Sequence, residues 1–223
     1  MEISAEKTKL MTNNISGINT EIKINEQKPE TVTRCKYLGS VITFEGSKPR
    51  IAQTTAALTG LKPVWNDKSI SLSSKIRLMH SLVISTFLYA CESWTLTAEL
   101  QRRMHVTEMR CYHKIQCISY KDHVNDEEVR AKMQQAIRPQ EDLLTMVKRC
   151  KLQWYGHVSC SSGLAKNILH GTVKGGRSQG RQRKGCEDNI REWTGLELAK
   201  SQRAVENREK WRKLVVKSSV VPQ

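Results

Sequence analysis

The sequence predicts an α+β fold that is mostly helical, and three observations support this class. Short β-prone runs separated by turn residues occupy residues 7–45. Beyond residue 46, apolar residues recur at the spacing of amphipathic helices. A glycine-rich basic stretch, residues 171–185, interrupts the second half. We therefore expect β hairpins over residues 1–46, a helical bundle over 47–120 and a basic helical C-terminal region over 121–223.

The N-terminal part is expected to form a small antiparallel sheet. Its β-prone runs lie at residues 10–12, 21–24, 31–33 and 41–44. A turn-forming segment at residues 25–29 separates the second run from the third, as is typical of short strands joined by turns.

The helical bundle is expected to contain three helices. The first begins near Pro49, a residue suited to an early helical position, and repeats apolar positions as far as Trp65. Ser71 or Ser73 can cap the second. The apolar stripe of the second helix consists of Leu72, Ile76, Met79, Val83, Phe87 and Ala90. The third is expected from about residue 97 to residue 118.

The C-terminal region is also expected to be helical apart from its glycine-rich stretch. Asn125 and Glu128 have the spacing of a capping box, and Pro139 opens another helical stretch that ends at residues 159–163. Residues 171–185 hold five glycines among basic residues, a composition that cannot build a core. The tail has helical spacing at Ala204, Arg208, Trp211 and Val215.

The charge distribution favours a polyanionic partner. The chain has 223 residues, a formal net charge of +15 and a pI near 9.7. Residues 151–223 hold 15 lysines and arginines against 6 acidic residues, whereas residues 1–100 hold 12 against 9. We therefore expect RNA and DNA to bind through their phosphates, mainly in the last third of the chain.

Membrane and secretory functions are not expected. The sequence has no apolar run long enough to cross a bilayer, and its start lacks the features of a signal peptide. Its seven irregularly spaced cysteines favour reduced thiols inside the cell, in nucleus or cytoplasm. Neither Cys150 with His157 and Cys160, nor Cys111 with His113 and Cys117, has the paired spacing of a strong zinc site.

No catalytic residue, cofactor or small-molecule substrate is expected for this chain. A polymerase needs paired carboxylates to hold two metal ions. No two of the aspartates are adjacent, and their positions are Asp67, Asp122, Asp126, Asp142 and Asp188. The pattern of a phosphate-binding P-loop does not occur.

Short motifs follow one another in a fixed order along the chain. They are Lys-Thr-Lys at residues 7–9, Tyr-Leu-Gly-Ser at 37–40, Tyr-Ala-Cys-Glu-Ser-Trp at 89–94, Trp-Tyr-Gly-His at 154–157 and Gly-Arg-Gln-Arg-Lys at 180–184. In this order they resemble the C-terminal part of the endonuclease-reverse transcriptases of non-LTR (LINE-type) retrotransposons. The resemblance implies the end of the palm, a thumb-like bundle and a basic C-terminal region, and it begins just after the family's catalytic Asp-Asp turn.

The resemblance also implies roles for individual residues. Lys7 and Lys9 would lie on a strand near the nucleotide, and the hairpin of Tyr37, Leu38 and Gly39 would grip the primer end. Glycine-spaced cations can follow a phosphate backbone. Those of the basic stretch are Arg177, Arg181, Arg183 and Lys184. The chain departs from the family at residues 182 and 186, where glutamine and cysteine replace the usual proline and tryptophan.

The resulting prediction is a fragment of a retrotransposon reverse transcriptase that lacks the catalytic carboxylates and binds RNA and DNA without sequence preference. Magnesium is expected only for the complete enzyme. One alternative is that the chain is part of a complete RNA-directed DNA polymerase and endonuclease. Another is a helical protein-interaction module whose positive charge is incidental. Taken singly, the motifs at residues 7–9 and 37–40 can be an ordinary strand and an ordinary turn. The basic stretch can likewise be a solvated loop without a specific ligand.

Overall fold

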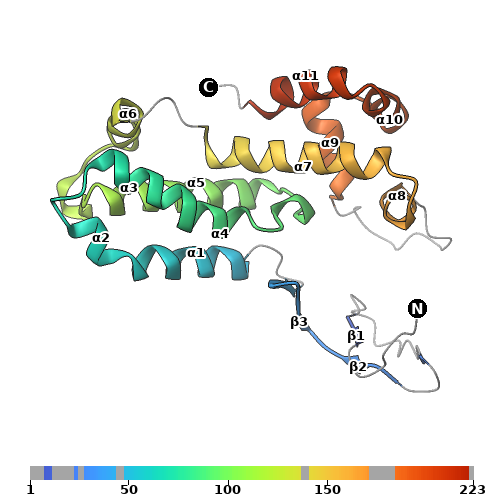
Figure 1. Cartoon of the computed structure of the whole chain (residues 1–223), viewed down its shortest axis with the longest axis horizontal. Coiled ribbons are helices and arrows are strands. Elements are labelled where there is room, and N and C mark those ends of the chain that lie inside the picture. The colour runs from blue at the N-terminus through green and yellow to red at the C-terminus, as the bar shows by residue number, and fades with distance from the viewer. Residues whose placement is uncertain are drawn as a thin grey trace. The chain divides into compact units, whose positions relative to one another are not determined.

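The computed structural model describes residues 8–11, 23–24, 28–43, 48–136, 141–170 and 184–220. The chain divides into two compact units, Met1–Arg50 and Ile51–Gln223. Short strands lie in the first unit and helices make up the second (Figure 1). The predicted class, α+β and mostly helical, is confirmed.

The described residues of the first unit form two strand pairs. β1 (Lys9–Leu10) pairs with β2 (Glu30–Thr31) in parallel, and β3 (Arg34–Tyr37) pairs with β4 (Ser40–Thr43) in antiparallel fashion. The expectation of one antiparallel sheet was therefore right for β3 and β4 and wrong for β1 and β2. A connection as long as residues 11–29 can return the chain to a parallel neighbour, which a short hairpin turn cannot do.

The bundle contains more helical segments than expected. They are α1 (Lys48–Gly60), α2 (Lys62–Asn66), α3 (Leu72–Leu78), the π-helical η1 (Met79–Ile84), α4 (Ser85–Leu88), the 3-10 turn η2 (Cys91–Ser93) and α5 (Ala98–Ile115). The first expected helix is split because Pro63 has no N–H to donate to the preceding turn. Ser71 caps α3 by accepting a hydrogen bond from the Ser74 N–H, and Thr97 caps α5 in the same way.

The C-terminal region consists of a long helix and several short ones. They are the 3-10 turn η3 (Tyr120–Asp122), α6 (Asp126–Ala136), α7 (Leu143–Cys160), α8 (Leu164–His170), α9 (Cys186–Thr194), α10 (Leu198–Glu206) and α11 (Arg208–Ser219). The expected tail helix is two helices, because Asn207 has non-helical dihedrals and its side chain caps α11 through the Lys210 N–H, 3.0 Å away. Pro139 lies outside the described residues.

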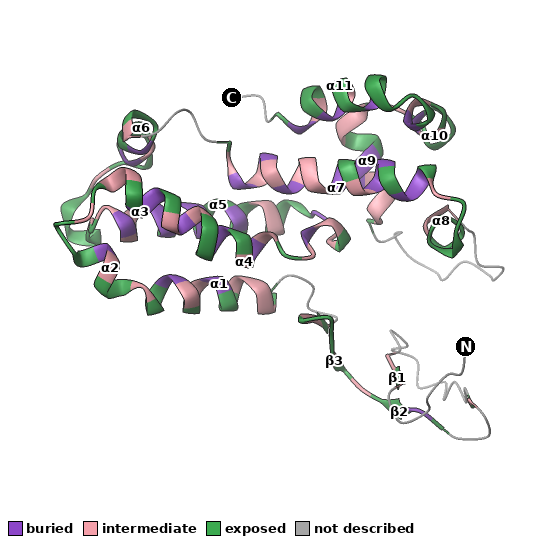
Figure 2. Ribbon diagram, viewed as in Figure 1, coloured by how far each residue is buried: buried purple, intermediate pink, exposed green. Residues whose placement is uncertain are grey.

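Helix α7 connects two hydrophobic cores within the second unit. It contacts α5 on one side and α10 and α11 on the other, and buried positions recur along its length (Figure 2). Its first half contributes Leu143 and Val147 to the core of the bundle. Its second half contributes Leu152 and Tyr155 to a smaller core with α9, α10 and α11. The placement of the C-terminal helices therefore depends on α7.

The segment after α4 is held in place by two buried polar side chains. The Lys151 ammonium group donates hydrogen bonds to the backbone carbonyls of Glu92 and Trp94. Asn189 accepts from the Leu96 N–H at 2.8 Å and donates to the Leu96 carbonyl at 2.9 Å. These bonds satisfy backbone groups that would otherwise be buried without partners, and they join α7 and α9 to the bundle.

Most of the apolar side chains of residues 87–94 pack into the core. Phe87 and Cys91 are fully buried, and Trp94 packs edge-on against Phe87 with ring centroids 5.3 Å apart. Tyr89, by contrast, is about half exposed. The tyrosine therefore does not contribute a full side chain to the core.

Candidate nucleic-acid interface

The β3–β4 hairpin presents apolar side chains at its tip. Tyr37 pairs with Ser40 in the strand register, so Leu38 and Gly39 form a two-residue turn. Both have positive φ, 47° and 78°, which is the pattern of a type I′ turn. The side chains of Tyr37 and Leu38 are 63% and 74% exposed. An exposed tyrosine ring at a tight turn offers a surface on which a base can stack.

Of the two lysines predicted to lie on a strand near the nucleotide, the structure describes one. Lys9 lies on β1 and forms an ion pair with Glu30 across the parallel strands, with 3.4 Å between Nζ and Oε2. Lys7 lies outside the described residues. An exposed pair of this kind contributes little to stability, so the Lys9 ammonium remains able to exchange its partner for a phosphate.

The predicted basic stretch is described only at its end. Arg177, Arg181 and Arg183 lie outside the described residues. Lys184 forms an ion pair with Glu192 of α9, with 2.5 Å between Nζ and Oε2. The charge of Lys184 is thus partly compensated within the chain.

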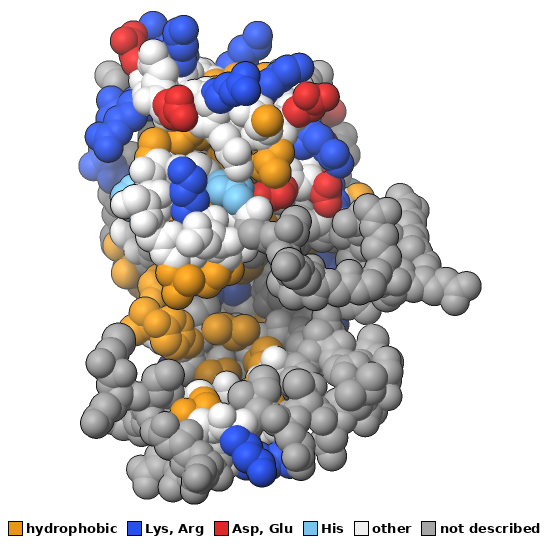
Figure 3. All heavy atoms as spheres, turned by 90° about the vertical axis from the view of Figure 1, so that its right-hand side faces the viewer, with side chains coloured by type: hydrophobic (Ala, Val, Ile, Leu, Met, Phe, Trp, Pro, Cys, Tyr) orange, Lys and Arg blue, Asp and Glu red, His pale blue; other side chains and the backbone are white. Residues whose placement is uncertain are grey.

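A basic surface on α10 and α11, which the sequence reasoning did not assign, adds to these residues. The two helices carry seven exposed lysines and arginines against two glutamates, Glu206 and Glu209. Lysine and arginine side chains gather over the upper part of the face shown in Figure 3, where these helices lie. Among the described residues, five of the seven have no ion-pair partner, namely Arg203, Arg208, Lys210, Arg212 and Lys217.

This surface could have been found from the charge count alone. The excess over residues 151–223 is larger than the five cations of the glycine-rich stretch can supply. The helical spacing does not reveal this surface. It runs through Ala204, Arg208, Trp211 and Val215 and so predicts one continuous helix. The break at Asn207 places the cations of two helices beside one another.

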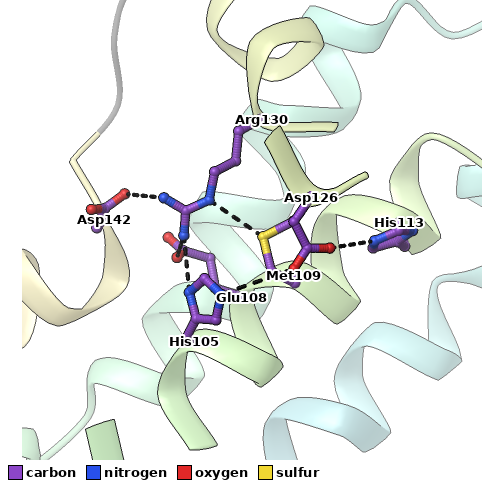
Figure 4. A network of polar contacts seen from close by, with 7 residues as sticks. All are labelled: His105, Glu108, Met109, His113, Asp126, Arg130 and Asp142. Atoms are coloured by element: carbon purple, nitrogen blue, oxygen red, sulfur yellow. Dashed lines mark hydrogen bonds and ion pairs between the residues drawn. The ribbon is translucent and has the colours of Figure 1, made fainter. Parts of the chain in front are cut away.

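A second polar cluster joins α5, α6 and the start of α7 (Figure 4). Glu108 is nearly buried, and one of its oxygens accepts hydrogen bonds from the Leu143 N–H at 2.9 Å and the Tyr112 hydroxyl at 3.1 Å. Arg130 donates to its other oxygen at 3.2 Å and to Asp142 at 3.3 Å. The adjoining cavity measures only about 20 Å³, so this cluster holds helices together and has no space for a substrate.

Glu108 makes the stability of the helical unit depend on pH. Burial is the largest cause that raises the pKa of Glu108 above its ordinary value, and the Asp142 charge adds to it. The Leu143 N–H and Arg130 partly offset both. A raised folded-state pKa gives a stabilising contribution that is complete below the unfolded pKa, about 4.3, and is lost as pH rises through the folded value.

We therefore expect Glu108→Gln to become more stable relative to the wild type as pH rises from about 4.3 towards neutrality. The measurement is the free energy of urea unfolding of both proteins at a series of pH values. Glu99→Gln is the control on the same helix, because Arg103 and Arg102 lower the pKa of Glu99 and its difference from wild type must have the opposite pH trend. Parallel curves for wild type and Glu108→Gln would disprove this role.

The cysteines do not assemble into either of the zinc sets considered above. All seven are free thiols. A hydrogen bond with Cys150, together with burial, raises the pKa of Cys91, whereas Cys160 donates to the Val205 carbonyl at 3.4 Å. Cys117 likewise donates to the Trp65 carbonyl at 3.2 Å. Within the described ranges, no group of three or more histidine, cysteine, aspartate or glutamate side chains is placed to hold a metal ion.

The comparisons with known proteins point to a mobile genetic element. A Caenorhabditis elegans protein described as an uncharacterized transposon-derived protein is 26% identical to this chain over 174 residues. The matched part is 71% of this chain and 59% of the relative, so the chain spans less than two thirds of that protein. No protein family model matches, and no solved structure matches. The similarity indicates a transposon-related origin.

None of the helices that the structure describes is both long and apolar enough to cross a bilayer.

Proposed function

We propose that this chain is a fragment of a non-LTR retrotransposon reverse transcriptase that binds the phosphate backbones of RNA and DNA without sequence preference. The observation that carries the proposal is the basic surface of α10 and α11, where five exposed cations have no ion-pair partner among the described residues. When such cations contact phosphates, counterions condensed on the nucleic acid are released, and this release provides most of the affinity of non-specific complexes.

Two further observations support the retrotransposon part of the proposal. The motif order resembles that family, and the relative from C. elegans is transposon-derived by its description. The type I′ turn at Leu38 and Gly39 gives the hairpin the compact tip that a primer-gripping role needs. In this proposal the basic stretch and the α10–α11 surface hold the backbone, and the hairpin contacts a strand end.

The proposal is tested by measuring fluorescence anisotropy of labelled RNA and DNA oligonucleotides of several unrelated sequences. We expect dissociation constants of about 10⁻⁴ to 10⁻⁶ M at physiological salt, similar for all sequences. A preference above about 3 kcal/mol for one sequence would indicate base readout and contradict non-specific binding. Absence of binding at the upper end of this range would contradict the proposal as a whole.

The hairpin makes a separate prediction. Tyr37→Ala is expected to weaken binding by about 1–3 kcal/mol for single strands and primer ends, because alanine has no ring on which a base can stack, and to leave binding to blunt duplexes unchanged. Anisotropy with the two kinds of substrate measures this difference. Tyr120→Ala is the matched control, since Tyr120 is 92% exposed and lies in the helical unit. Equal losses for both variants would remove the hairpin from the proposed interface.

Polymerase activity separates this proposal from that of a complete enzyme. We expect the purified chain with primed RNA, nucleotides and magnesium not to extend the primer, because it has no paired carboxylates to hold two metal ions. The measurement is primer extension resolved on a gel, with an active reverse transcriptase as positive control. Template-dependent extension would show that the chemistry resides in this chain after all.

A further inference from the structure

A groove of about 690 Å³ runs between α7 and α11, and its rim includes Arg208 and Arg212 of the basic surface described above. Each helix lines it with residues spaced four apart, which therefore form a row along one face. The row on α7 is Arg149, Gln153 and His157, and the row on α11 is Arg208, Arg212 and Val216.

The floor of the groove is aliphatic. Gly156 and Val215 are buried beneath it, and Val216 on its wall is 62% exposed. Trp211 also lines the groove but is only 5% exposed, and its indole N–H donates to the Leu152 carbonyl at 3.2 Å. The tryptophan ring is thus committed to the core. His157 on the α7 wall is the exposed ring among the lining residues, and the floor itself has no exposed aromatic face on which an unpaired base could stack.

The rim of the groove is cationic. Three arginines line it and no acidic residue does. Arg149 is paired with Glu141, whereas the described residues supply no ion-pair partner to Arg208 or Arg212. Guanidinium groups bind carboxylates through paired, charge-assisted hydrogen bonds. An aliphatic floor under an unpaired cationic rim is complementary to a ligand with one apolar side and flanking carboxylates.

The dimensions of the groove match a short helix. Its α7 wall extends from Arg149 to Cys160, which at 1.5 Å per residue is about 16 Å, or three helical turns. Amphipathic helices commonly bind proteins by laying their apolar side into a groove between two helices.

We propose that the α7–α11 groove binds an acidic amphipathic helix of a partner protein. The apolar side of that helix contacts Val216 and the floor beside it, and its flanking carboxylates pair with Arg208 and Arg212. The two arginines are shared with the surface proposed for nucleic acid, and the apolar floor distinguishes the groove, because phosphate contacts do not require one.

The test uses the full chain and two labelled helical peptides with the same leucine face, flanked by glutamates in one and by lysines in the other. Fluorescence anisotropy should show binding of the glutamate peptide and at least about tenfold weaker binding of the lysine peptide, a difference of 1.4 kcal/mol. Failure of the glutamate peptide to bind, or equal binding of both peptides, would overturn the proposal.

Three single variants then locate the site. Val216→Glu and Arg212→Glu should each weaken binding of the glutamate peptide at least about tenfold. Lys217→Glu, an exposed neighbour outside the groove lining, should leave it unchanged. Circular dichroism checks that Val216→Glu folds. Folding is expected because the side chain at this position is exposed. Equal losses for Arg212→Glu and Lys217→Glu, with none for Val216→Glu, would mean general charge attraction and overturn the groove.

Nucleic acid provides the remaining comparison. A single-stranded RNA that displaces the glutamate peptide, and whose own binding is abolished in Val216→Glu, would assign the groove to nucleic acid instead. RNA binding that persists in Val216→Glu while peptide binding is abolished would support the proposal, because only the helix would then depend on the apolar part of the groove. Failure of the wild type to bind RNA would contradict the proposed function and leave the peptide result to be judged alone.

Discussion

Replacing Gly156 with alanine is expected to lower the free energy of unfolding of the helical unit by about 1–3 kcal/mol, as overpacking of a close contact does. A Cβ at this position would overlap the indole of Trp211, lying 2.7 Å from its Cδ1 atom. The ring cannot easily move away, because its N–H donates a hydrogen bond to the Leu152 carbonyl. The ring also packs against that of Tyr155, with 5.8 Å between the two ring centroids. The contact joins α11 to α7.

Urea unfolding followed by circular dichroism and tryptophan fluorescence measures this effect. Gly163→Ala is the matched control, because a Cβ there meets no atom within 4 Å. We expect its stability to differ from wild type by no more than about 0.5 kcal/mol, as at other open surface positions. If Gly156→Ala were as stable as Gly163→Ala, α11 could not be packed on α7 as described.

The second large effect is expected from four of the five basic residues of the glycine-rich stretch. Replacing Arg177, Arg181, Arg183 and Lys184 together with alanine should weaken RNA and DNA binding to a similar extent for all sequences. It should also make the plot of log binding constant against log salt concentration less steep, by about 0.7 to 0.9 in slope for each phosphate that the variant no longer neutralises. Lys184 is expected to contribute least, since Glu192 already pairs with it.

A charge-matched control separates this local effect from a change in net charge. Alanine at four exposed cations between residues 62 and 121 removes the same four charges, and these cations are Lys62, Arg102, Arg110 and Lys121. Their replacement should change the salt dependence much less. Equal changes in the two variants would mean that only total charge matters, and unchanged binding in the first would make the basic stretch a solvated linker.

Local sequence signals predicted the parts of the fold that depend on neighbouring residues. Ser71, one of the two serines expected to cap the second helix, is an example, because an N-cap bonds to an N–H three residues away. The third bundle helix was likewise recognisable from its apolar face. The π-helical segment η1 and the parallel pairing of β1 with β2 were not, since they depend on packing and on strand partners distant in sequence.

The candidate sites show the same division. The hairpin at Tyr37 to Gly39 was identified from residues adjacent in sequence, and the structure gives it the expected tight turn. Asn189, however, pairs with Leu96 across 93 residues, and no local pattern indicates such a bond. The Trp-Tyr-Gly-His motif was noted for its resemblance, and its glycine now has a physical explanation in the approach of Trp211.

The central claim is that the chain binds nucleic acid through phosphate contacts, and the salt dependence of wild-type binding tests it most directly. The dissociation constant for one RNA and one DNA of mixed sequence is measured by anisotropy between about 50 and 200 mM salt. We predict a straight line in log–log form, with a slope that corresponds to several phosphate contacts and is the same for unrelated sequences. A flat line, or a slope that depends on sequence, would contradict the claim.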